Sequence, residues 1–274
     1  MAIEEPYPEL EEFLTLIGEA GQRISDIDAS EGAAGNISVF LGWPVDPRRR
    51  FPIVEDLELP VAVPELAGGT LLATGSGRRL REVIQDPAAN LGVVAVEEGG
   101  RTAKLFTSPR RLFARLTSEF NSHLAVHRDQ VISTGTNFHT VIHAQPPNLT
   151  YLSHIPRYQD QMYLNRHLLR WQPELIVNLP EGVGYVPFHI PGSDELMSAT
   201  VESLRIHRVV LWAKHGAMAR SDTSVKRASD RIEYAETAAH YEYMNLLNGE
   251  QGTGLTSDEI LAICGAYNVR QEIF

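Results

Sequence analysis

Two short strand patterns joined by a glycine turn constrain the fold of this chain more than any other feature. Leu91–Glu97 and Arg101–Phe106 are connected by Glu98-Gly99-Gly100, which is typical of a β-hairpin. A hairpin pairs its strands antiparallel, so the sheet is not built only from parallel strands and crossover helices. Helix and strand patterns are interspersed along the 274 residues, with no repeat and no linker. We therefore expect an α/β fold, a single domain over residues 1–274 with layers around a mixed sheet.

The remaining elements are predicted from hydrophobic periodicity and from turn residues. Helices are expected over Glu9–Asp28, Ser118 to about His127, Pro156–Gln172, Asp194–Arg205, Ser224–Asn248 and a short last helix after the capping box Thr256-Ser257-Asp258-Glu259. Strands are expected over Ile37–Trp43, Thr70–Thr74, Phe138–His143, Gly182–Phe188 and Arg208–Ala213. Thr117 or Ser118 is placed to cap the second of these helices.

Charge and targeting signals exclude several classes of function. The formal net charge is −11, which repels the phosphate backbones of nucleic acids and anionic lipid surfaces. The longest apolar runs, such as Leu91–Val96 and Val209–Ala213, are too short to cross a bilayer. The N-terminus carries no secretory signal, and Cys264 is the only cysteine, so no internal disulfide forms. We expect a cytoplasmic protein that binds neither nucleic acid nor membrane.

Two histidines mark a candidate metal site. His143 and His215 each stand at the end of a predicted strand, and neutral imidazoles that converge there are ligands for a divalent cation. The chain has ten histidines, so structural or surface roles for these two remain the alternative. His139 lies four residues before His143 and shares its face of the strand, where support of a metal ligand competes with a simple solvent-facing or core position.

Hydroxyl and glycine residues mark a candidate anion site. Thr117-Ser118-Glu119 stands at a predicted helix start, where hydroxyls and free N–H groups can hold an anion and the carboxylate can act as a base. The turns Gly35-Asn36 and Thr74-Gly75-Ser76-Gly77 let the backbone approach a ligand closely. Neither turn has the spacing of a Walker loop or of a dinucleotide fingerprint. A plain helix cap and two ordinary turns are the competing interpretation.

Taken in order, these pieces resemble the class II, zinc-dependent aldolases of the aldolase/adducin family. The similarity runs from about Gly18 to the C-terminal helix, and the order of many short matches is more specific than any one motif. The matching segments are Gly35-Asn36, Thr74-Gly75-Ser76-Gly77, Asp86-Pro87-Ala88-Ala89-Asn90-Leu91-Gly92, Thr117-Ser118-Glu119, His143, Gly182-Val183-Gly184, Pro191-Gly192, Asp194-Glu195, Leu211-Trp212 and His215-Gly216.

The resemblance implies a three-layer α/β/α subunit with a mixed, largely antiparallel central sheet. It also implies a homotetramer with active sites between neighbouring subunits. The match is to the branch of the family that cleaves a sugar phosphate, L-rhamnulose 1-phosphate, reversibly to dihydroxyacetone phosphate and L-lactaldehyde. A zinc ion in such an enzyme stabilises, as a Lewis acid, the negative charge that develops beside the carbonyl.

The resemblance also assigns roles to residues of this sequence. His143 and His215 would be metal ligands, and Glu119 would be the proton-transferring carboxylate beside the metal. Glu174 would be a second carboxylate, contributed by the adjacent subunit near the aldehyde oxygen. The phosphate would be held by Asn36, Ser76, Gly77, Thr117 and Ser118.

One departure from the family pattern concerns the metal. The usual His-x-His reads His143-Ala144-Gln145 here, and a glutamine carbonyl is a neutral and weaker ligand than an imidazole. Three outcomes follow. Gln145 coordinates zinc or another divalent metal, or a group such as His154 or Glu119 completes the shell, or the metal and its chemistry have been lost. Ala33, where a polar residue is expected near the phosphate loop, is a second departure.

These departures leave three functions open at this point. The first is the metal-dependent aldolase of L-rhamnulose 1-phosphate. The second is a related enzyme acting on another substrate, such as an L-fuculose 1-phosphate aldolase or a pentulose-phosphate epimerase. The third is a non-catalytic, adducin-like assembly protein, which the replacement at Gln145 favours.

Overall fold

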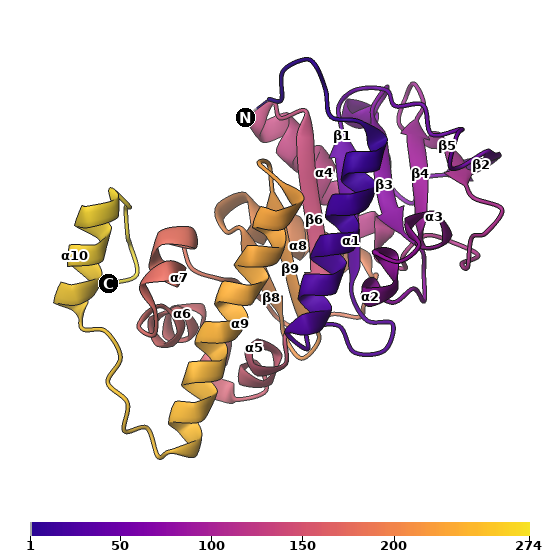
Figure 1. Cartoon of the computed structure of the whole chain (residues 1–274). Coiled ribbons are helices and arrows are strands. Elements are labelled where there is room, and N and C mark those ends of the chain that lie inside the picture. The colour runs from indigo at the N-terminus through magenta and orange to yellow at the C-terminus, as the bar shows by residue number, and fades with distance from the viewer. Residues whose placement is uncertain (1) are drawn as a thin grey trace.

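Nine strands form one continuous sheet in the order β2-β5-β4-β3-β1-β6-β9-β8-β7. The computed structural model describes residues 2–274 and is shown in Figure 1. The strands are β1 (Asn36–Leu41), β2 (Ile53–Glu58), β3 (Thr70–Thr74), β4 (Leu91–Val96), β5 (Thr102–Thr107), β6 (Phe138–Ala144), β7 (Gly184–Val186), β8 (Val209–Trp212) and β9 (Gly216–Ser221). Within residues 2–274, neighbouring strands pair antiparallel except β7 and β8. The predicted mixed, largely antiparallel sheet is confirmed.

Helices cover both faces of this sheet. The helices are α1 (Leu10–Asp26), α2 (Leu80–Val83), α3 (Pro87–Asn90), α4 (Phe120–Thr134), α5 (Pro147–Leu152), α6 (Gln161–Leu169), α7 (Pro173–Asn178), α8 (Asp194–Ile206), α9 (Val225–Leu247) and α10 (Ser257–Tyr267), with short 3-10 turns at Pro64–Leu66 and Pro156–Gln159. Helices α1 and α9 lie side by side across one face, and α4 and α8 pack together on the other.

The alternation of side chains along the central strand β1 explains why apolar cores lie on both faces of the sheet. Ile37, Val39 and Leu41 belong to the larger core under α1 and α9. Phe40 belongs to a second core that includes residues of α4. Because successive side chains of a strand point to opposite faces, β1 separates these two layers of apolar contacts.

Among the differences from the sequence-based predictions are two strands, the start of one helix, and the predicted helix Pro156–Gln172, which is a 3-10 turn followed by α6. The strand β2 was not expected: most of its side chains are exposed, because it is an edge strand whose charged residues show no burial pattern. The strand β9 was not expected either. Helix α4 begins at Phe120, with Glu119 rather than Thr117 or Ser118 at the N-cap position. Thr117 is instead held beside β3, where its N–H donates to the Thr74 carbonyl, so the helix starts later.

Several local predictions are confirmed. The hairpin is formed by β4 and β5, and the capping box is present at Thr256 and Glu259. Cys264 is buried, as expected of a core residue. Over residues 2–274, none of the helices combines the length and the apolar character that a membrane span requires.

Candidate active site

Most of the predicted site residues lie at one edge of the sheet. In an antiparallel sheet the start of one strand lies beside the end of its neighbour. Asn36, the first residue of β1, therefore pairs with His143 near the end of β6. The turn between β8 and β9 brings His215 to the same edge, and Glu119 reaches it from the segment just before α4. Asn36 and His215, 179 positions apart in the chain, are thus brought to the same edge of the sheet.

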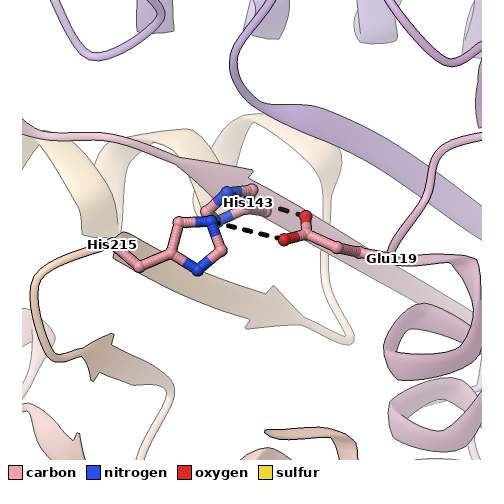
Figure 2. Close-up of side chains that lie close together, drawn as sticks. All are labelled: Glu119, His143 and His215. Carbon is pink, nitrogen blue, oxygen red and sulfur yellow. Dashed lines mark ion pairs between the residues drawn. The ribbon is translucent and has the colours of Figure 1, made fainter. Parts of the chain in front are cut away.

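Three side chains at this edge, Glu119, His143 and His215, converge on one point (Figure 2). One ligand atom from each lies within 4.8 Å of the others. His143 Nε2 is 3.6 Å from Glu119 Oε2, and His215 Nε2 is 3.4 Å from Glu119 Oε1. Glu119 is 4% exposed and His143 2%. Two imidazoles and a carboxylate at this spacing are a donor set that suits zinc and related divalent cations.

The tautomer of His143 also suits a metal. Its Nδ1 lies 2.9 Å from the carbonyl oxygen of Ala217, which only accepts, so Nδ1 carries the proton. In the neutral ring Nε2 then keeps its lone pair, and this atom faces Glu119. A backbone acceptor behind a histidine ligand fixes the orientation of the ring in metal sites. The residues present therefore fit a divalent cation.

A tight turn presents His215. Lys214 has a positive φ of 63°, which is uncommon outside glycine, and its N–H donates to Ser153 Oγ at 2.7 Å. Gly216 follows, and a Cβ at that position would lie 2.4 Å from the Ala144 carbonyl oxygen and 3.0 Å from His143 Cε1. A side chain there would push β9 away from β6, so the close approach of the two rings requires glycine.

Burial sets the protonation states of this cluster. Burial lowers the pKa of His215 to about 4, helped by His143 and opposed by Glu119. Burial also acts to raise the pKa of Glu119, but His143, the Asn36 hydrogen bond and His215 together outweigh it and leave that pKa below its usual value. At neutral pH the site therefore holds an ionised carboxylate beside a neutral His215 ring, the forms that bind metals.

A polar pocket of about 190 Å³ surrounds the cluster. It is lined by Ala33, Ala34, Gly35, Asn36, Gly75, Ser76, Gly77, Thr117, Ser118, Glu119, His143, Gln145, Pro191 and His215. All five predicted phosphate-binding residues line this pocket, and their role in holding a phosphate stays a prediction. The backbone N–H groups of Gly77 and Ser118 have no acceptor within residues 2–274 and can donate to an anion. A larger open groove of about 460 Å³, beside Tyr7 and Trp43, contains none of the predicted site residues.

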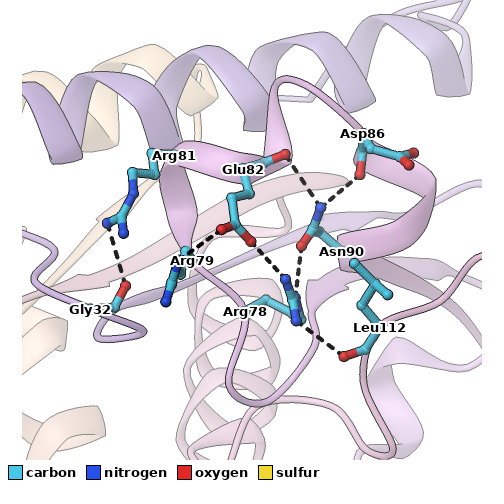
Figure 3. A network of polar contacts seen from close by, with 8 residues as sticks. All are labelled: Gly32, Arg78, Arg79, Arg81, Glu82, Asp86, Asn90 and Leu112. Atoms are coloured by element: carbon cyan, nitrogen blue, oxygen red, sulfur yellow. Dashed lines mark hydrogen bonds and ion pairs between the residues drawn. The ribbon is translucent and has the colours of Figure 1, made fainter.

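A buried polar network holds the loop that carries Ser76 and Gly77 (Figure 3). Arg78 donates to Asn90 Oδ1 at 2.8 Å and to Glu82 Oε2 at 2.7 Å. Asn90, which is 2% exposed, donates in turn to the carbonyl oxygens of Glu82 and Asp86. Arg78 does not line the pocket, and its guanidinium group anchors the loop through these hydrogen bonds.

Gln145 lines the pocket, and its amide has a partner outside the cluster. With the amide nitrogen assigned toward Glu31, Gln145 donates to both carboxylate oxygens, 3.3 Å to Oε2. This contact leaves the carbonyl oxygen of Gln145 free of Glu31. Coordination of a metal by Gln145 remains a prediction. Sequence reasoning missed Glu31, because it lies 114 residues before Gln145 in the chain and no local pattern joins them.

Glu174 is the one predicted catalytic residue that lies elsewhere. It belongs to the first turn of α7, is exposed and does not line the pocket. Its expected role required it to act from an adjacent subunit, and that role remains a prediction.

Comparisons with known proteins agree with this geometry. A family model described as "Class II Aldolase and Adducin N-terminal domain" matches residues 16–243. The chain is 32% identical over 214 residues to the rhamnulose-1-phosphate aldolase of Klebsiella pneumoniae subsp. pneumoniae, covering 78% of this chain and 76% of that protein. It is 31% identical over 245 residues to the rhamnulose-1-phosphate aldolase of Yersinia pestis, covering 87% of each. The crystal structure of a sugar-phosphate aldolase from Thermotoga maritima superposes with a TM-score of 0.73 at 29% identity, covering 89% of this chain and 99% of that one.

Proposed function

The chain belongs to the class II aldolase and adducin family, and on that premise we propose that it is a metal-dependent sugar-phosphate aldolase. The observation that carries the proposal is the convergence of Glu119, His143 and His215 within 4.8 Å of one another. A binding-only protein has little physical need for an ionised carboxylate buried between two imidazoles, because burying a charge costs free energy.

The proposed substrate is L-rhamnulose 1-phosphate, cleaved to dihydroxyacetone phosphate and L-lactaldehyde. Two relatives named rhamnulose-1-phosphate aldolase support this choice at 31–32% identity. The pocket supports an anionic substrate, because its hydroxyls and free N–H groups can hold a phosphate without lysine or arginine. Its volume of about 190 Å³ is below the range of roughly 300–1,000 Å³ for drug-sized ligands, as expected of a site for a small sugar phosphate.

The chain's own residues divide the chemistry among them. His143 and His215 would hold the cation, with Gln145 as a further ligand and Glu119 as a ligand while substrate is absent. When bound, the cation would supply Lewis-acid stabilisation of negative charge on the substrate oxygens. The Glu119 carboxylate, ionised at neutral pH, takes and returns the proton at the carbon beside the carbonyl. Asn36, Ser76, Gly77, Thr117 and Ser118 orient the phosphate and so fix that carbon against Glu119.

Glu174 would complete the site from a neighbouring subunit of a homotetramer, close to the aldehyde oxygen. Two observations support an assembly. Glu174 is exposed in the isolated subunit, and large apolar side chains are exposed on the second half of α9, where Met244 is 50% and Leu247 71% exposed. Sedimentation velocity tests the assembly, and a monomer at micromolar concentration would contradict it.

The decisive experiment is a substrate panel with a matched pair of variants. L-Rhamnulose 1-phosphate, L-fuculose 1-phosphate and a pentulose 5-phosphate are offered to the zinc-loaded protein, and dihydroxyacetone phosphate is measured with a coupled dehydrogenase. Glu119→Gln should lower kcat by about 10²–10⁴-fold, whereas Glu98→Gln, in the exposed hairpin turn, should leave it unchanged. No release of dihydroxyacetone phosphate from any substrate would refute the proposal.

A non-catalytic assembly protein is the second candidate, and the observation that favours it is the glutamine at position 145. Metal analysis separates the two. Purified protein that retains no divalent ion, and that gains no turnover with added zinc, cobalt or manganese, would favour the assembly protein.

A further inference from the structure

Behind Glu119, five buried side chains form a hydrogen-bonded chain, of which the proposed reaction uses only the first. In order from the site they are Asn36, His123, Ser38, His127 and His139. Asn36 is 7% exposed and the other four are fully buried. They come from three elements, the strands β1 and β6 and the helix α4, so they lie between the sheet and the helix that follows Glu119.

The contacts are continuous from one end to the other. His123 Nε2 lies 2.5 Å from Asn36 Oδ1, and its Nδ1 lies 2.6 Å from Ser38 Oγ. The same hydroxyl is 2.7 Å from His127 Nε2. His127 Nδ1 is 2.9 Å from His139 Nδ1. Each of the first two rings therefore uses both of its nitrogens.

Glu119 sets the direction of the first bond. Asn36 Nδ2 donates to Glu119 Oε2 at 2.8 Å, and an ionised carboxylate only accepts. The amide is therefore oriented with its nitrogen toward Glu119 and its oxygen toward His123. Because that oxygen also only accepts, Nε2 of His123 must carry a proton.

The remaining directions follow one by one. Burial lowers the pKa of His123 to about 3, so the ring is neutral and its Nδ1 is an acceptor. The Ser38 hydroxyl must donate to it, which leaves the Ser38 oxygen to accept from Nε2 of His127. Burial also holds the pKa of His127 well below its ordinary value. Its Nδ1 is then an acceptor, so the bond to His139 is donated by His139 Nδ1.

The far end of the chain agrees with this direction. With its proton on Nδ1, a neutral His139 has a bare acceptor at Nε2, and that atom is buried with no partner among residues 2–274. Burial, reinforced by Arg220 and Arg231, keeps the pKa of His139 well below its ordinary value. The opposite direction would place an N–H there without an acceptor, and orphaned N–H groups are the rarer case in proteins.

We infer that Ser38, His123, His127 and His139 are positioning residues that fix the Asn36 amide with its nitrogen facing Glu119. A rotated amide would place its oxygen against the carboxylate and would require every donor in the chain to reverse. The chain thereby holds the Glu119 carboxylate at one place beside the two imidazoles. Its effect on turnover rests on the proposed function, whereas its direction does not.

The first arm of the test reads the ring nitrogens directly. Protein labelled with ¹⁵N-histidine is studied by NMR at pH 7, with signals assigned through single histidine variants. The expected pattern is neutral rings with the proton on Nε2 in His123 and His127 and on Nδ1 in His139. The opposite tautomers, or a charged ring in the chain, would overturn the inference.

The second arm removes one link. Ser38→Ala removes the donor to His123 Nδ1, so the ¹⁵N signal of that nitrogen should shift to that of an acceptor without a partner, while Nε2 keeps its proton. The kcat should fall by about tenfold, the loss of one buried hydrogen bond, with KM changed less than the turnover. Thr140→Val is the matched control, because the Thr140 hydroxyl is buried in β6 and has no partner within residues 2–274. It should change neither quantity. Equal behaviour of the two variants would overturn the inference.

A second pair of variants covers the case in which Ser38→Ala does not fold. In His127→Gln the side-chain nitrogen can still donate to Ser38, so the His123 tautomer should be kept. In His127→Leu the donor to Ser38 is gone, so the Ser38 hydroxyl should be held less firmly against His123 and kcat should fall toward that of Ser38→Ala; equal kcat values and equal His123 signals in the two variants would overturn the inference. If the wild-type protein cleaves no sugar phosphate, the proposed function fails, while the ring nitrogens still decide the direction of the chain.

Discussion

The buried histidines His123, His127 and His139 should make the free energy of unfolding depend steeply on pH below about 6.5. Burial lowers the pKa of His123 to about 3 and those of His127 and His139 well below their ordinary value. In the unfolded chain a histidine titrates near pH 6.5. The contribution of these neutral rings to the free energy of unfolding is thus fully present above pH 6.5. It is lost as the pH falls, because unfolding then takes up protons.

The magnitude follows from the number of rings. Each proton taken up on unfolding changes the free energy of unfolding by about 1.4 kcal/mol per pH unit. In the unfolded protein each of the three rings is mostly protonated below pH 6. The three together therefore lower the free energy of unfolding by about 3–4 kcal/mol between pH 6 and pH 5. That loss is a large share of the roughly 5–15 kcal/mol that stabilises a typical protein.

One variant isolates a single ring. His139→Asn removes the titrating group, and its amide nitrogen can still donate to His127. Urea unfolding is followed by circular dichroism between pH 5 and pH 6.5, in chelator and at fixed protein concentration. The loss between pH 6 and pH 5 should be about 1 kcal/mol smaller than in the wild type. The control His154→Asn, at an exposed position, should match the wild type. Equal losses in His139→Asn and wild type would refute the reasoning.

Three further predictions concern the pocket and its support. Gln145→His adds an imidazole and should tighten zinc binding on the order of tenfold, measured by competition with a chromophoric chelator; unchanged affinity would show that position 145 does not reach the metal. Gly75→Ala should lower the free energy of unfolding by about 1–3 kcal/mol, because its Cβ would lie 2.1 Å from Phe113 Cγ. Gly265→Ala is the control, because open space surrounds this position in α10, and it should raise the melting temperature. A shift of the melting temperature in the same direction for the two glycine variants would contradict the packing argument. Arg78→Met loosens the loop that carries Ser76, so KM for the sugar phosphate should rise more than kcat falls; an unchanged KM would count against the anchoring role.

The parts of the fold that were predicted correctly are those with a local cause. The β4–β5 hairpin is encoded by a glycine turn between two apolar runs, and the α10 capping box by four adjacent residues. The strand β2 was missed because an exposed edge strand lacks the burial pattern that marks other strands. The start of α4 was misplaced because a contact of Thr117 with Thr74, 43 residues earlier in the chain, delays the helix.

The site shows the same division. His143 and His215 could be paired in advance because both follow the apolar run of a predicted strand, and strands that run in the same direction end at the same edge of a sheet. The chain behind Glu119 could not, because the Ser38–His123 contact spans 85 residues and depends on how α4 packs against β1. Spacing correctly placed His139 on the face of β6 that His143 shares, but it could not reveal the partner of His139 on α4.

The position of β9 between β6 and β8 has a consequence for biosynthesis. His143 leaves the ribosome with the first half of the sheet, but the acceptor that orients its ring, the Ala217 carbonyl, and the second imidazole are translated more than 70 codons later. A nascent chain that stops before Gly216 can pair β1 with β6 and still has an unfinished cation-binding centre. The proposed cation site is therefore complete only after the last strand of the sheet has been inserted.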